Sequence, residues 1–254
     1  MSRFFTSDWH LGSTNVLEYS SRPFKTAGEA ASSLVDACND VAHKADVVFH
    51  VGDFWLSGVD RHGKTPDENA LTADPDDYLR FIFARFVLLS GNHDDGHNVE
   101  SDLKSMSVDL NRNYRDVYVS HFPSNHHEYK GPGRIPKGKP FIALCGHVHD
   151  KWKYFYDNKN HVLNYNVGVD CHNYRPVKDS DITEDLDFIF THHDFNNSWK
   201  MTCEDEVKWK AEIKLNLNIA RVQRKHDRYL KKGLTETECL RRKEEAMRKK
   251  GLVK

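Results

Sequence analysis

The stretch Gly91-Asn92-His93-Asp94 follows the apolar run Phe86-Val87-Leu88-Leu89, so it lies where a predicted strand ends and a loop begins. Four other short polar stretches follow β-type runs in the same way. They are Ser7-Asp8-Trp9-His10, Gly52-Asp53, Ser120-His121-Phe122 and Gly146-His147-Val148-His149. Polar side chains at the ends of parallel strands commonly meet in one crevice. Five such strand ends, carrying Asp, His and Asn, therefore predict a single site assembled from distant parts of the chain.

The pattern around these stretches predicts an α/β fold. Residues 27–43 repeat apolar side chains at intervals of three and four, as in an amphipathic helix, and lead into a buried strand at 47–51. A second helix is expected with Asp74 as its N-cap and Pro75 at its first helical position, and a weaker one covers about 98–106. Residues 152–167 predict a hairpin. Parallel units followed by antiparallel strands indicate a four-layer αββα sandwich of two mixed β-sheets flanked by helices.

Charge is distributed unevenly, although the net charge of the whole chain is only −1. Residues 220–254 contain 13 Lys or Arg against 5 Asp or Glu, a net charge of +8 that leaves −9 for residues 1–219. We expect a catalytic domain over 1–195 and a charged, basic, helical extension over 196–254. This extension either contacts nucleic acid electrostatically or packs back onto the acidic domain. The basic tail at 220–254 lacks interleaved aromatic residues beyond Tyr229, so we do not expect a single-strand stacking platform.

The cysteine content predicts a reducing compartment. The chain has five cysteines, an odd number, and no C-x-x-C pair, which favours free thiols over a disulfide framework. The chain also enters a predicted strand within its first residues, so we expect no signal peptide. No apolar run approaches the roughly 20 residues needed to span a bilayer. A cytoplasmic protein without a membrane contact is therefore expected.

The polar strand ends offer carboxylate, imidazole and amide groups suited to metal binding. These candidate ligands are Asp8, His10, Asp53, Asn92, His121, His147 and His149. Asp8 and His10 are two residues apart, so both can project in one direction, and the two histidines of Gly146–His149 repeat that spacing. Mixed carboxylate and imidazole ligands suit Mn²⁺, Fe or Zn²⁺ better than Ca²⁺. Two adjacent cations could clamp both oxygens of a phosphoryl transfer.

The ordered series D-x-H, G-D, G-N-H-D, H and G-H-x-H, spread over residues 8–149, resembles the calcineurin-like metallophosphoesterase superfamily. Gly52-Asp53 is not followed by the D-x-x-D-R-G pattern of protein Ser/Thr phosphatases, so that branch is set aside. The loops at 22–24 and 173–177 resemble those of small phosphoesterases from bacteria and their phages. The resemblance implies a dinuclear metal-dependent phosphoesterase that hydrolyses phosphomonoesters or phosphodiesters.

The resemblance also implies a role for each matching residue. One metal ion would be held by Asp8, His10, Asp53 and His149, and the other by Asp53, Asn92, His121 and His147. A metal-bridging hydroxide would attack the phosphorus in line. His93 would protonate the leaving group, and Asp94 would orient His93. Mn²⁺ is the expected metal ion, with Fe, Zn²⁺, Ni²⁺ or Mg²⁺ as alternatives.

Substrate and partners are less closely defined. A nucleotide or another small phosphoester is expected as the substrate. Arg22 and Arg175 either bind the substrate phosphate bidentately or pin their loops through a carboxylate. A metal-dependent nuclease or cyclic nucleotide phosphodiesterase that uses the basic tail is one alternative. An inactive metallophosphoesterase scaffold that binds partners is another, but no ligand and no catalytic histidine has been lost.

Overall fold

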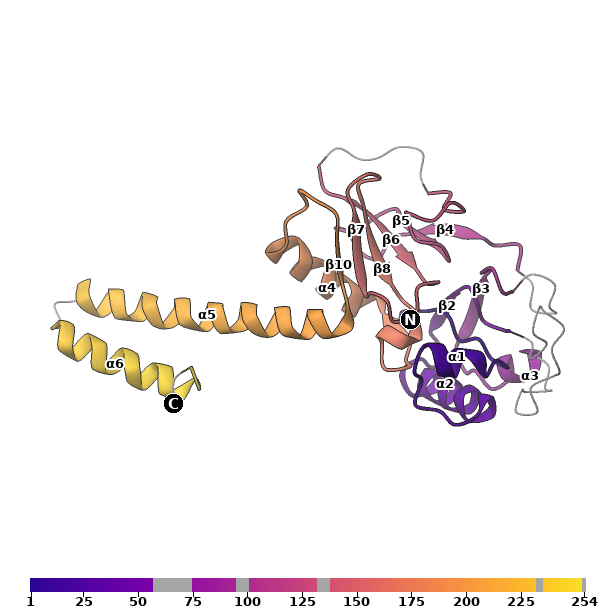
Figure 1. The fold of residues 1–254 in the computed structure, drawn as a ribbon, viewed down its shortest axis with the longest axis horizontal. Helices are drawn as coiled ribbons and strands as arrows, with labels where there is room; N and C mark the ends of the chain where they lie inside the picture. The colour runs from indigo at the N-terminus through magenta and orange to yellow at the C-terminus, as the bar shows by residue number, and fades with distance from the viewer. Residues whose placement is uncertain (57–74, 95–100, 132–137, 232–234, 253–254) are drawn as a thin grey trace. The chain divides into compact units, whose positions relative to one another are not determined.

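The computed structural model describes residues 1–56, 75–94, 101–131, 138–231 and 235–252 (Figure 1). The chain divides into two compact units, Met1–Cys203 and Glu204–Lys254. The first unit contains both β-sheets, and the second is helical. The last strand, β10 (Trp199–Met201), belongs to the first unit, where it pairs antiparallel with β7 (Tyr154–Asp157).

The first sheet has four strands in the order β3-β2-β1-β9. They are β1 (Arg3–Thr6), β2 (Val47–Val51), β3 (Arg85–Leu89) and β9 (Val177–Lys178). Strands β1, β2 and β3 run parallel, and β9 pairs antiparallel with β1. Val48 and Val51 on opposite faces of β2 are both fully buried, as expected for a central strand of a parallel sheet. The predicted strand at 47–51 is confirmed.

The second sheet has six strands in the order β10-β7-β8-β6-β5-β4. Besides β7 and β10 they are β4 (Ser105–Val108), β5 (Val117–Ser120), β6 (Phe141–Cys145) and β8 (Val162–Asn166). Strands β5, β6 and β8 run parallel, whereas β4, β7 and β10 are antiparallel to their neighbours. The antiparallel pair β7 and β8 confirms the hairpin predicted over 152–167. Each sheet therefore contributes three parallel strands, whose carboxyl ends carry the polar stretches.

Helix α2 (Ala27–Val41) packs on the first sheet through one apolar stripe. Its Leu34 and Cys38 are fully buried in a cluster with Phe4 of β1 and Val48 of β2. This is the helix that the spacing of apolar residues predicts, and it ends two residues before the predicted end. Because residues three and four apart share a helix face, the amphipathic pattern is enough to locate the stripe.

The sequence predicts some of the other described helices of the first unit and misses others. They are α1 (Asn15–Tyr19), α3 (Pro75–Leu79), α4 (Asp179–His192) and the short 3-10 helix η1 (Val169–Cys171). Helix α4 has no counterpart among the predicted elements, although its buried residues Ile182, Leu186 and Ile189 have helical spacing. The fold class predicted from the sequence, α/β with two mixed sheets, helices and a C-terminal helical region, is confirmed (Figure 1).

One predicted helix is wrong where the structure describes it. Residues 95–100 lie outside the described residues. The predicted N-cap Asp74 also lies outside them, but α3 begins at Pro75, the residue predicted as the first helical position. Within the rest of 98–106, residues 101–104 form no helix and β4 begins at Ser105. Strand β4 pairs along its whole length with β5, and this tertiary pairing overrides the weak local helix propensity.

The C-terminal region contains two helices, α5 (Cys203–Lys231) and α6 (Glu236–Lys249). Helix α6 is capped by Thr235, whose hydroxyl accepts a hydrogen bond of 3.4 Å from the backbone N–H of Glu238. Across the described residues, no helix combines the length and the apolar character needed to cross a membrane.

Candidate metal centre

The predicted site residues lie at the carboxyl ends of the parallel strands of both sheets. Two groups of side chains bring their ligand atoms within 4.8 Å of one another, and each could hold a metal ion. The first cluster is Asp8, His10 and His149, and the second cluster is Asp53, His121 and His147. Asn92 joins the second cluster, because its Oδ1 lies 3.1 Å from His121 Nε2 and 3.0 Å from His147 Nδ1.

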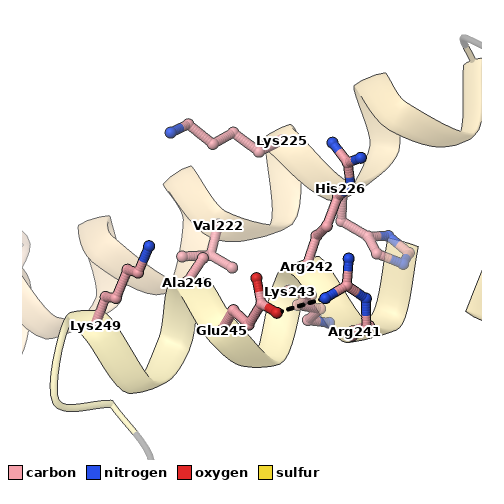
Figure 2. A pocket seen from close by; sticks show the side chains of 9 residues that line it. All are labelled: Val222, Lys225, His226, Arg241, Arg242, Lys243, Glu245, Ala246 and Lys249. Carbon is pink, nitrogen blue, oxygen red and sulfur yellow. Dashed lines mark hydrogen bonds and ion pairs between the residues drawn. The ribbon is translucent and has the colours of Figure 1, made fainter. Parts of the chain in front are cut away.

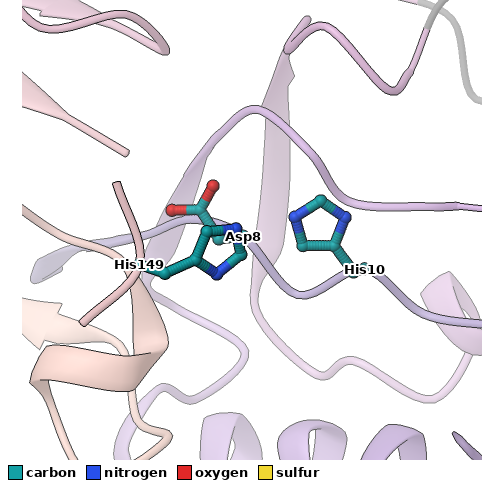
Figure 3. A group of neighbouring side chains, drawn as sticks. All are labelled: Asp8, His10 and His149. Atoms are coloured by element: carbon teal, nitrogen blue, oxygen red, sulfur yellow. The ribbon is translucent and has the colours of Figure 1, made fainter. Parts of the chain in front are cut away.

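The first cluster combines the loops after β1 and β6 (Figure 3). The rings of His10 and His149 stack with centroids 5.1 Å apart. The backbone N–H of His147 donates to both Asp8 oxygens, at 2.9 and 3.1 Å, and so ties the two loops together. His10 is 2% exposed, yet neither of its ring nitrogens makes a hydrogen bond to the described residues. A buried polar atom without a partner is costly, and a bound cation would satisfy it.

The second cluster directs lone pairs toward one point. The ring of His121 donates through Nδ1 to the carbonyl oxygen of Val51 at 2.9 Å, because a carbonyl can only accept. In its neutral form the ring therefore presents a lone pair at Nε2, which lies 3.2 Å from Asp53 Oδ2. Asn92 Oδ1 is also an acceptor near this atom. Lone pairs that face one another repel unless a proton or a cation lies between them. This set of ligand atoms therefore fits a metal ion.

Asp53 lies between the two clusters. Its Oδ2 is 3.5 Å from His10 Nε2 of the first cluster and 3.2 Å from His121 Nε2 of the second. Its other oxygen, Oδ1, accepts a hydrogen bond of 2.9 Å from the backbone N–H of His93. A single carboxylate oxygen therefore lies within reach of both candidate metal positions. This is the geometry that a bridging ligand needs.

Burial and neighbouring charges shift the pKa values of the histidines in the two clusters in different directions. Burial lowers the pKa of His10 well below its ordinary value, although Asp53 opposes the shift. Burial and the neighbouring His121 lower the pKa of His147 to about 4. Burial also acts against a proton on His121, but the Asp53 carboxylate outweighs it and raises the pKa of His121 to about 9. Two of these imidazoles are thus held neutral, the form in which histidine binds a metal.

The candidate ligands are held by unusual backbone conformations. Ten of the described non-glycine residues have a positive φ, and five of them are candidate ligands. These five are Asp8 (61°), His10 (49°), Asp53 (57°), His147 (73°) and His149 (52°). The left-handed region is uncommon for residues other than glycine, although Asp and His adopt it more readily than most, and such conformations are concentrated at functional sites. The strand-end loops therefore aim these side chains at a cost in backbone energy.

Asp94 stabilises the loop that carries Asp53. Its carboxylate is 3% exposed and accepts backbone hydrogen bonds from Asp53 (2.7 Å), Phe54 (2.9 Å), Trp55 (3.3 Å) and Gly91 (2.8 Å). These bonds join the loops after β2 and β3. In the structure Asp94 therefore holds the backbone of these two loops. Its predicted role, the orientation of His93, stays a prediction.

Two motif glycines are required by close approach to the ligands. Gly52 has a φ of +91°, and a Cβ there would lie 2.6 Å from His121 Nδ1. A Cβ on Gly146 would lie 2.6 Å from Asp8 Oδ2. Both distances are far below van der Waals contact, so only glycine leaves room for the ligand side chains.

Asp170 is a site residue that the motifs do not reveal. It follows β8, the third parallel strand of the second sheet, and its Oδ2 accepts a hydrogen bond of 3.0 Å from His149 Nδ1. This bond uses Nδ1, so Nε2, which lies 3.3 Å from the Tyr19 hydroxyl, is the ring nitrogen left to bind a metal ion. The sequence did carry one signal for Asp170. Gly168-Val169-Asp170 follows a β-type run with a glycine and a carboxylate, much as Gly52-Asp53 does.

Arg22 connects Asp170 to the first cluster. The guanidinium binds both oxygens of Asp170, at 2.7 and 2.9 Å, and donates to the carbonyls of Asp8 at 2.6 Å and Trp9 at 3.0 Å. Arg22 is only 5% exposed, which favours loop anchoring over contact with a substrate phosphate. The side chain of Arg175 is 55% exposed and lies 3.7 Å from Asp40. A role for either arginine in substrate binding stays a prediction.

His93 lies beside the first cluster. The centroids of its ring and the His10 ring are 5.2 Å apart. A hollow of about 580 Å³ adjoins the second cluster on the side of Asn92. Lys104, Tyr118, Phe122 and Lys130 are among the residues that line it. The site therefore combines two candidate metal positions, a neighbouring imidazole and a cavity with two cationic side chains.

Comparisons with known proteins found similar chains whose names state no activity. No protein-family model matches the chain. The uncharacterized protein MJ1445 of Methanocaldococcus jannaschii is 25% identical over 178 residues, which cover 68% of this chain and 85% of that protein. The crystal structure of AQ665, a protein of unknown function from Aquifex aeolicus, is similar with a TM-score of 0.49 and 18% identity, over 72% of this chain and 98% of that chain.

Proposed function

We propose that this chain is a metal-dependent phosphoesterase of the calcineurin-like metallophosphoesterase superfamily, with a centre for two divalent metal ions. The observation that carries the proposal is the position of Asp53, whose Oδ2 lies within 3.5 Å of a histidine from each cluster. The order of the five motifs along the chain supports the same assignment. Two metal positions that share one carboxylate are suited to the hydrolysis of a phosphoester.

In this proposal Asp8, His10 and His149 hold one metal ion, and Asn92, His121 and His147 hold the other, with Asp53 shared. Two adjacent divalent cations, when bound, lower the pKa of a water molecule and balance the charge on phosphoryl oxygens. Asp170 and Arg22 keep His149 and the Asp8 loop in place. The mixture of imidazole and carboxylate ligands suits Mn²⁺, Fe or Zn²⁺, and Mn²⁺ is the ion that we expect and test first.

His93 is the proposed proton donor to the leaving oxygen. It follows the ligand Asn92 directly, and its ring packs against His10. As an imidazolium it can also stabilise the negative charge that develops on the phosphoryl oxygens. The hollow beside Asn92 has room for the ester group, and Lys104 and Lys130 favour an anionic one. Both monoesters and diesters fit this arrangement.

The test is an activity panel with metal analysis. The purified chain, loaded with Mn²⁺, is assayed against aryl phosphate monoesters and diesters, nucleotides, cyclic nucleotides and nucleic acids. We expect hydrolysis of at least one class, loss of activity with a chelator, and recovery when Mn²⁺ is restored. Two metal ions bound per chain with no hydrolysis of any class would overturn the proposal and favour the inactive scaffold.

The His93→Ala variant separates catalysis from metal binding. We expect turnover to fall by about 10²- to 10⁴-fold, the usual contribution of a general acid, while two metal ions per chain are still bound. The measurement is kcat on the best substrate of the panel, together with elemental analysis of the metal content. His43→Ala removes an exposed histidine of the first unit and serves as the control. Turnover of His93→Ala within about twofold of the control would rule out the assigned role.

A further inference from the structure

A basic groove lies between helices α5 and α6 of the second unit. It consists of two adjoining hollows of about 360 and 310 Å³, which share Val222, Lys225 and Ala246. Nine of its lining residues are Lys or Arg, and Glu245 is the one acidic residue among them. Figure 2 shows the first hollow with side chains from both helices around it. The lining therefore concentrates positive charge in a concave surface.

Most of this charge is not neutralised within the chain. Arg221, Arg224, Lys225, Arg228 and Lys249 make no ion pair or side-chain hydrogen bond with the described residues. Holding like charges together is unfavourable unless an anion compensates them. An uncompensated cluster of this kind is therefore suited to an external polyanion.

A buried histidine opens on the same groove. His226 is 9% exposed, and neither of its ring nitrogens makes a hydrogen bond to the described residues. Its Nδ1 lies 3.6 Å from Asp227 Oδ1. In Figure 2 the His226 ring lies at the same end of the hollow as the Arg241 guanidinium. A phosphate oxygen between these groups would satisfy polar atoms that the chain leaves without a hydrogen bond.

We propose that the basic groove binds the phosphate backbone of double-stranded nucleic acid without sequence preference. On α5 the cations Arg221, Arg224, Lys225 and Arg228 recur at intervals of three and four, so they form a stripe about 10 Å long at 1.5 Å per residue. Such a stripe matches a row of phosphates, and arginine can bind each phosphate bidentately. Among the described residues, no Phe, Tyr or Trp lines either hollow.

The described lining residues favour the duplex over two other candidate ligands. Binding of single strands relies on stacking of bases on aromatic rings, so a groove without them favours the duplex backbone. Helices that lie in a membrane surface place Trp, Phe or Leu beside their cations, and the apolar lining residues here are only Val222 and Ala246. This binding activity does not depend on the metal centre. If both proposals hold, nucleic acid becomes the substrate class of the phosphoesterase.

The experiment measures binding of the full chain to a labelled 20-base-pair DNA duplex by fluorescence anisotropy. A chelator is present throughout, so hydrolysis cannot contribute and the result is separate from the proposed function. The test variant is Lys225→Ala/Lys249→Ala, which removes two cations that line the groove. The control variant is Lys208→Ala/Lys214→Ala, which removes two cations from α5 outside the groove. Circular dichroism checks that helix content is retained.

The expected result is duplex binding that weakens with salt. The log–log salt slope should become shallower by about two for the test variant, since each phosphate contact contributes about 0.9. We expect a loss of affinity of at least about tenfold for the test variant and of less than about twofold for the control. Equal effects of the two variants would overturn the proposal. So would a duplex affinity no higher than that for a single strand, or binding only to phosphatidylserine vesicles.

Discussion

The Asp53→Asn variant is expected to lose phosphoester hydrolysis almost completely, with turnover reduced by at least about a thousandfold. That factor corresponds to about 4 kcal/mol of transition-state stabilisation, within the range that bound metal ions supply. The substitution keeps the size of the side chain but removes the negative charge that both clusters share. It also turns one oxygen into an NH₂ donor, which cannot face a metal ion beside His10 and His121.

The fold should survive this substitution. The loop around Asp53 is held by backbone hydrogen bonds to the carboxylate of Asp94, which stays in place. We therefore expect a melting temperature close to that of the parent chain when both are stripped of metal. Elemental analysis should show fewer than two metal ions per chain. Asp36→Asn, an exposed carboxylate on α2, is the matched control. Full turnover of Asp53→Asn with two metal ions bound would refute the bridging role.

The Arg22→Ala variant is expected to lose about 3–5 kcal/mol in the free energy of unfolding. The reason is the buried Asp170 carboxylate, which would lose its guanidinium partner and keep only the hydrogen bond from His149 Nδ1. The carbonyls of Asp8 and Trp9 would also lose their donors. We expect weaker metal binding as well, because the loop that carries Asp8 and His10 loses its anchor.

Chemical denaturation measures the change in stability, and Arg175→Ala is the control. The Arg175 side chain is 55% exposed and 3.7 Å from Asp40, so its removal should cost less than about 1 kcal/mol. The double variant Arg22→Ala/Asp170→Ala also removes the buried Asp170 charge that Arg22 compensates. It should therefore be more stable than Arg22→Ala alone. A cost for Arg22→Ala no larger than that of Arg175→Ala would show that the buried ion pair contributes little to the fold.

Much of the centre was predictable because its signals are local. An apolar run followed by glycine and a polar residue marks a strand end, and this holds for Gly52-Asp53 and for Gly146-His147 alike. The side chains at such ends meet in space whenever the strands are parallel, as β1, β2 and β3 are. The amphipathic stripe of α2 was predictable for the same reason, since a helix face repeats within a few residues.

Other features depended on neighbours far away in the chain. The weak helix pattern at 98–106 gave way to β4, because pairing with β5 outweighs a local preference. The contribution of Asp170 could not be predicted from its own surroundings, since its partner Arg22 is 148 residues away. For Arg22 the sequence left two roles open, binding of the substrate phosphate and anchoring of its loop. Its burial against the Asp170 carboxylate favours loop anchoring.

The sequence by itself determined the chemistry of the centre, because the choice of Asp, His and Asn at strand ends is a property of individual residues. It also determined the basic character of the C-terminal region. The resemblance of the motifs also implied which ligands share a metal position, with Asp53 in both sets. Tertiary structure alone decided how far apart these groups lie, which loops Arg22 and Asp170 join, and where the basic charge gathers into a groove. Those features depend on distances between segments, and only the pairing of strands and the packing of helices set such distances.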